Sequence, residues 1–97
     1  MKNLFDIKNK VIVITGGCGI LGKNIANYLA EQGAKIVILD RVEEAGRELE
    51  AELNRKSEAL FLVTDVLNKE VLEENKKAIL ERFGTIDVLL NAAGGNM

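Results

Sequence analysis

One stretch decides the fold: Val11-Ile12-Val13-Ile14-Thr15-Gly16-Gly17-Cys18-Gly19-Ile20-Leu21-Gly22. Its first four residues form an unbroken β-branched run, which is typical of a strand buried on both faces of a parallel sheet. A cluster of glycines follows at once, and beyond it apolar residues recur at helical spacing: Leu21, Ile25, Tyr28 and Leu29. Gly33 is suited to end that helix. The stretch therefore predicts a strand, a glycine-rich turn and a helix in direct succession.

The same alternation continues along the rest of the chain. Further buried strands are expected over residues 36–39, 59–63 and 86–90. The intervening helices are indicated by apolar residues on one face and by an N-cap at Asn68, the apolar set being Ala45, Leu49, Leu53, Leu72, Ile79 and Phe83. Because each pair of parallel strands needs a crossover, this order predicts an α/β protein with a doubly wound parallel sheet.

The glycine-rich turn is a candidate phosphate site. A helix N-terminus offers unpaired N–H groups and the positive end of the helix dipole, and glycine lets the backbone approach a ligand closely. The residues expected at the phosphates are Gly16, Cys18, Gly19, Ile20, Leu21 and Gly22. A tight turn without a ligand is the alternative interpretation. Cys18 is either a small residue tolerated in the loop or a thiol with a lowered pKa and a redox role.

A carboxylate follows at the position where a dinucleotide fold places one. Asp40 ends the second strand 18 residues after Gly22, and there a carboxylate accepts hydrogen bonds from the adenosine ribose hydroxyls. Its charge would repel the 2′-phosphate of NADP, so NAD is the predicted cofactor. The neighbouring Arg41 supports the opposite choice, because an arginine there can bind that phosphate.

Composition excludes several function classes. A net charge of −2 argues against a nucleic-acid groove. The 97 residues contain no histidine, so neither a Ser-His-Asp triad nor a histidine-ligated metal site is expected. The single cysteine cannot form an internal disulfide, and no segment resembles a membrane span or a secretory signal. A cytoplasmic location without membrane partners is predicted.

With these residues in view, the chain resembles the short-chain dehydrogenase/reductase family. The matching segments are residues 5–11 before the first strand, the glycine motif, Asp65-Val66, and Asn91-Ala92-Ala93-Gly94. The resemblance implies a Rossmann-type sheet in the order 3-2-1-4, truncated after its fourth strand. Residues 1–97 would then be the N-terminal part of one NAD(P)-binding domain. It also implies that Asp65 and Val66 contact adenine and that residues 91–94 lie along the cofactor ribose.

Within the family, the glycine motif permits two branches. Ile20 stands where the common pattern has its middle glycine, and the spacing of Gly16, Gly19 and Gly22 is similar to that of the extended branch of sugar-nucleotide epimerases. The segments at Asp65 and Asn91 resemble the other, classical branch. The combination is most similar to members called D-mannonate oxidoreductases or fructuronate reductases, which implies a sugar acid or polyol substrate.

The family's catalytic Ser, Tyr and Lys follow the fourth strand, and no residue of this chain matches them. Tyr28 lacks a lysine four positions later, where Gln32 stands, and it is expected in the core. The chain alone is therefore predicted to be inactive, within a homo-oligomeric parent enzyme that acts on a small molecule. A stand-alone nucleotide-binding module that never catalyses is the alternative. Apolar residues 86–90 are expected to form an exposed edge strand in the chain as it stands.

Overall fold

The computed structural model describes residues 6–92, which form four strands and three helices in strict alternation. They follow the order β1 (Val11–Thr15), α1 (Ile20–Glu31), β2 (Lys35–Asp40), α2 (Glu43–Asn54), β3 (Ala59–Val63), α3 (Lys69–Phe83) and β4 (Val88–Asn91). All pairings are parallel, and the sheet order is β3-β2-β1-β4. The predicted α/β fold and strand order are confirmed. Strand β4 is shifted toward the C-terminus of the predicted residues 86–90, since β1 pairs with it from Val88 onward.

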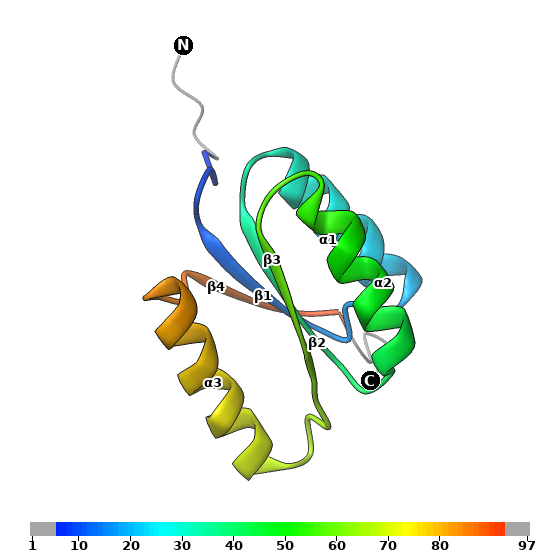
Figure 1. Ribbon diagram of the computed structural model, residues 1–97, viewed down its shortest axis with the longest axis vertical. Helices are drawn as coiled ribbons and strands as arrows, with labels where there is room; N and C mark the ends of the chain where they lie inside the picture. Colours follow the sequence, from blue (N-terminus) through cyan, green and yellow to red (C-terminus); the bar gives the residue numbers. More distant parts are fainter. Residues whose placement is uncertain (1–5, 93–97) are drawn as a thin grey trace.

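The sheet has helices on both faces, with α1 and α2 on one and α3 on the other (Figure 1). Side chains of β1 and β2 alternate between these faces, as the pleat requires. Ile12, Ile14, Ile36 and Ile38 join the larger apolar cluster with α1, α2 and Phe61. The alternate valines and Leu39 join a smaller cluster with Ile79 of α3. Both central strands are therefore buried on both sides, as their unbroken apolar runs predict.

Helix α1 packs on the sheet only partly as predicted: Ile25 and Leu29 contact the larger apolar cluster, whereas Leu21 and Tyr28 do not lie in the core. Tyr28 is 62% exposed and Leu21 60% exposed, so the expectation that Tyr28 lies in the core is wrong. The buried residues are instead Gly22, Ala26 and Ala30, which recur every four positions. These small residues let the helix axis approach the sheet closely, and the larger side chains are displaced to the sides and to solvent.

Helix α3 is bounded by the predicted signals. The Asn68 side chain accepts a hydrogen bond from the Val71 N–H at 3.2 Å, and Gly84 ends the helix with φ of +82°, where glycine is favoured. No helix among residues 6–92 is both long and apolar enough to cross a membrane.

Candidate dinucleotide-binding site

The predicted site residues gather at the carboxyl edge of the sheet, where every parallel strand ends. The loop between β1 and α1 turns at Gly16, whose φ is +68°, and the Gly16 N–H donates to the Leu39 carbonyl at 2.8 Å. A residue with a side chain is strained at that φ. The bond to Leu39 fixes the glycine loop against the end of β2, which carries Asp40.

Two glycines of this loop are required by packing inside the protein. A Cβ on Gly22 would lie 2.7 Å from the Gly17 Cα, and one on Gly17 would lie 2.8 Å from the Ile38 Cδ1. A Cβ on Gly19 would meet only the Gly16 carbonyl oxygen, at an ordinary 3.7 Å. Nothing in the local sequence marks Gly17 as a packing residue, because its partner Ile38 is 21 positions away and only the folded sheet brings the two together.

The N-terminus of α1 is open to a ligand. Its N-cap residue Gly19 makes no side-chain cap hydrogen bond, and the first turn contains no acidic residue. The first-turn residue Ile20 is 84% exposed. No side chain of α1 itself caps its first amides, and open first-turn amides are the arrangement that binds phosphate elsewhere.

Asp40 lies directly beside this loop. One carboxylate oxygen accepts from the Cys18 N–H at 3.0 Å and the other from the Val42 N–H at 3.1 Å. These two bonds hold a half-buried carboxylate at the end of β2. Arg41 is exposed and lies between β2 and α2.

The thiol of Cys18 is suppressed by its surroundings. Burial raises its pKa to about 11, with further contributions from the charge of Asp40 and a hydrogen bond to it, against a smaller lowering by Lys23. Of the two interpretations of Cys18, the structure favours a small loop residue, which packs against the larger apolar cluster.

The segment after β3 also borders the site, beside the glycine loop and Asp40. Asp65 is exposed and its carboxylate accepts from the Leu67 N–H at 3.0 Å, while Val66 is 42% exposed. The preceding residue, Thr64, donates its N–H to the Asp40 carbonyl at 2.8 Å. The predicted ribose and adenine segments are therefore joined through one backbone hydrogen bond.

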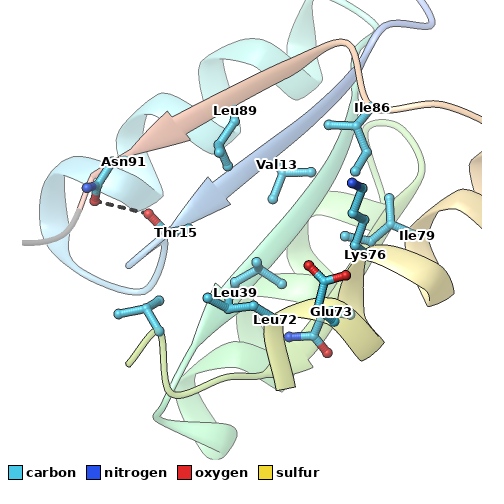
Figure 2. A pocket seen from close by; sticks show the side chains of 12 residues that line it. Val13, Thr15, Leu39, Leu72, Glu73, Lys76, Ile79, Ile86, Leu89 and Asn91 are labelled. Atoms are coloured by element: carbon cyan, nitrogen blue, oxygen red, sulfur yellow. Dashed lines mark hydrogen bonds between the residues drawn. The ribbon is translucent and has the colours of Figure 1, made fainter. Parts of the chain in front are cut away.

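The end of β4 borders the site as well. The Thr15 hydroxyl donates to the Asn91 side-chain oxygen at 3.0 Å (Figure 2), and the Ala92 N–H donates to the Thr15 carbonyl at 2.9 Å. These bonds fasten residues 91 and 92 to the start of the glycine loop. The predicted site residues Ala93 and Gly94 lie outside the described residues.

A cavity of about 500 Å³ opens beneath this edge, between α3 and the sheet (Figure 2). Its walls are mainly apolar, with Thr15 and Asn91 at the end of the sheet and the side chains of Glu73 and Lys76 on α3. Val66 and Leu89 also line it, and Leu89 is 66% exposed. The face of the sheet that carries α3 is therefore much less completely filled than the face that carries α1 and α2.

A parallel sheet in the order 3-2-1-4, with a glycine loop between its first strand and helix, defines an α/β protein of the Rossmann type. Residues 10–97 match the family model described as short chain dehydrogenase. The chain belongs to that family.

Individual relatives agree with this assignment. UxuB of Bacillus subtilis, an oxidoreductase of uncharacterized activity, is 40% identical over 92 residues, covering 94% of this chain and 33% of UxuB. An NAD-bound, provisionally assigned D-mannonate oxidoreductase from Haemophilus influenzae superposes with a TM-score of 0.87 at 38% identity, covering 93% of this chain and 32% of that one. The chain spans about a third of the length of these relatives.

A third relative carries the other dinucleotide. L-sorbose reductase from Gluconobacter frateurii, solved with NADPH and L-sorbose, superposes with a TM-score of 0.85 at 33% identity, covering 91% of this chain and 34% of that one. Structures similar to this chain thus include both NAD and NADPH complexes.

Proposed function

We propose that residues 1–97 are the N-terminal part of a single NAD(P)-binding domain and bind the adenosine diphosphate portion of NAD for an oxidoreductase. The observation that carries the proposal is the Asp40 carboxylate held against the backbone of the uncapped glycine loop. Amide donors for a phosphate and a carboxylate acceptor for ribose hydroxyls thereby lie side by side. NAD, when bound, supplies hydride transfer at its nicotinamide ring.

The residues fit such a ligand in four places. The pyrophosphate would lie over Gly16, Cys18 and the turn from Gly19 to Gly22, where Gly19 leaves open space. Asp40 would accept from the adenosine ribose hydroxyls, and Asp65 with Val66 would contact the adenine. Residues 91–94 would lie along the cofactor ribose. No residue of this chain is assigned a catalytic role in the proposal.

NAD is the proposed cofactor in preference to NADP. A 2′-phosphate would bring a second negative charge to the half-buried Asp40, and like charges at short range in a partly desolvated site repel strongly. The similar NAD-bound structure supports this choice, whereas the similar NADPH-bound reductase makes Arg41 the residue to test.

The proposed substrate class is a sugar acid or a polyol and its ketone. Its support is similarity alone: relatives include a provisionally assigned D-mannonate oxidoreductase and a reductase crystallised with L-sorbose. Acidic and neutral sugars share the secondary alcohol that a nicotinamide oxidises.

Calorimetric titration of the chain with NAD, ADP-ribose and nicotinamide mononucleotide tests the proposal. NAD and ADP-ribose are expected to bind with Kd values within about threefold of each other, because the residues described here contact the part that they share. Nicotinamide mononucleotide is expected not to bind measurably. A folded chain that bound nicotinamide mononucleotide as tightly as ADP-ribose, or bound neither, would contradict it.

A further inference from the structure

A buried polar pair connects α3 to the segment that follows β3. Thr64 is 1% exposed and Asn75 is 9% exposed, and within residues 6–92 these are the two buried polar side chains. The Asn75 side-chain amide donates to the Thr64 hydroxyl at 2.7 Å. The hydroxyl in turn donates to the Leu62 carbonyl at 2.8 Å. The pair is directional, and it fixes the distance between α3 and the end of β3.

Thr64 stands between the two segments assigned to the adenosine. Its N–H donates to the carbonyl of Asp40, the proposed ribose ligand, and its peptide carbonyl leads into Asp65, the proposed adenine ligand. The residues that follow have little packing of their own, since Asp65 is exposed and Leu67 is 87% exposed. Thr64 is therefore the buried anchor from which the adenine segment extends.

An apolar pair of the same shape would fill this space equally well. Replacing both members of a buried hydrogen bond by apolar groups is often nearly neutral for stability, whereas a hydrogen bond specifies one rotamer and one distance. The presence of two buried polar groups that bond to each other is thus better explained by a requirement for position than by a requirement for stability.

We propose that Thr64 and Asn75 are positioning residues that set the adenine segment Asp65-Val66 at its working distance from Asp40. The inference rests on the proposed binding of NAD. Neither side chain touches the cofactor; both act through the backbone of residues 64–66. Loss of the pair lets that backbone move relative to β2, and the adenine contacts weaken while the phosphate contacts remain.

Four variants separate position from stability, with ADP-ribose as the probe. Thr64→Val removes the hydroxyl and keeps the shape, and Thr64→Ser keeps the hydroxyl. The double variant T64V/N75L makes the pair wholly apolar. Ser57→Ala is the matched control, because it removes a 2.6 Å hydrogen bond to the Ala34 carbonyl near the opposite end of β3.

The expected result is a rise of about tenfold in the Kd for ADP-ribose in T64V and in T64V/N75L, the size of effect that one buried hydrogen bond supports. Thr64→Ser should restore the Kd. The double variant should regain the wild-type Tm yet keep the raised Kd, with faster amide exchange at residues 65–67. Ser57→Ala should lower the Tm and leave the Kd unchanged.

Wild-type affinity in the folded double variant would overturn the inference and leave the proposed function intact. If the double variant did not fold, T64V would be compared with S57A, each at a temperature equally far below its own Tm. A higher Kd for ADP-ribose in T64V would support the inference, and equal Kd values would overturn it. A folded wild-type chain that did not bind ADP-ribose would instead refute the proposed function, and the inference with it.

Discussion

Single glycines in the loop after β1 meet different physical demands. Gly22 is enclosed by the backbone of Gly16 and Gly17, so its lack of a side chain serves the packing of α1 on the sheet. A Cβ on Gly19 would make only an ordinary contact, with the Gly16 carbonyl oxygen, so nothing within the described residues requires glycine there. A bound phosphate would require glycine at position 19. Substitutions at Gly22 and Gly19 therefore test folding and ligand binding separately.

Alanine substitutions should show this separation. Gly22→Ala is expected to lower the free energy of unfolding by about 1–3 kcal/mol, the usual cost of overpacking. Gly19→Ala should change it by less than about 0.5 kcal/mol, yet weaken ADP-ribose binding at least about tenfold by crowding the pyrophosphate. Urea unfolding and calorimetry measure the two effects. An unchanged affinity for ADP-ribose in Gly19→Ala would mean that the loop is only a tight turn and does not bind the pyrophosphate.

Charge and geometry can be separated at Asp40. Asp40→Asn keeps an oxygen that can accept from the Cys18 N–H and removes the negative charge. We expect the ratio of the NADP Kd to the NAD Kd to fall about tenfold, since the repulsion of the 2′-phosphate disappears. Arg41→Ala is the comparison variant and should alter this ratio little. If Arg41→Ala changed this ratio more than Asp40→Asn does, Arg41 would be the residue that determines the choice between NAD and NADP.

The raised pKa of Cys18 predicts slow alkylation. The thiolate is the nucleophile, so the reaction rate with iodoacetamide should increase with pH toward a midpoint of about 11, well above the value of an ordinary thiol. Asp40→Asn should lower that midpoint, although burial, the largest cause, remains. A midpoint near 8.5, typical of a free cysteine, would show that neither burial nor Asp40 suppresses the thiol.

At the scale of helices and strands, the sequence predicted most of what local pattern controls. Apolar runs located all four strands, and Asn68 and Gly84 bounded α3. The centre of the buried face of α1 was missed, because Gly22, Ala26 and Ala30 carry a weaker apolar signal than Leu21 and Tyr28. Close helix approach is decided by the size of side chains against a particular sheet, and that information is not local.

The candidate site divides in the same way. Residues that follow strand ends, such as Asp40 and Asp65, could be located because parallel strands end at one edge. Gly17 and the Thr64–Asn75 pair could not be located, since their importance lies in partners 11 to 21 positions away. Spacing within a motif is visible in a sequence, whereas the contact between two elements is not.

The N-cap of α3 offers a test at this scale. Asn68→Ala removes the acceptor for the Val71 N–H and should lower the free energy of unfolding by about 1 kcal/mol. Asn68→Asp keeps an acceptor and should leave that free energy nearly unchanged. Thermal unfolding followed by circular dichroism provides the measurement. Equal destabilisation by both variants would mean that the cap hydrogen bond contributes nothing.

Considered as a whole, the described molecule has one complete face and one open face. β4 pairs only with β1 among the described strands, and Val88 and Leu89 are exposed, whereas Leu90 packs against the larger cluster. The predicted exposure of strand four is thus confirmed for two of its three apolar residues. An exposed apolar edge is a site for pairing with another chain.

The 97-residue chain is therefore expected to self-associate at micromolar concentration. Leu89→Lys should shift it toward monomer in sedimentation velocity, because a charge on an edge strand opposes pairing. Leu80→Lys, at a 39% exposed position of α3, is the control and should leave the degree of self-association unchanged. A wild-type monomer whose amides at residues 88–91 resist exchange would show that this edge is protected within one chain.

The unequal faces also bear on the order in which the protein forms during synthesis. All buried members of the larger cluster lie between Ile12 and Phe61, and the bond between Asp40 and the glycine loop lies within the same span. The smaller cluster needs Ile79, and the pairing of β1 with β4 joins residues 76 positions apart, as between Ile12 and Val88. A nascent chain leaving the ribosome therefore exposes all buried members of the larger cluster, with the glycine loop and Asp40, before α3 emerges. Nucleotide at cellular concentration would then meet that loop early and stabilise the emerging polypeptide by mass action.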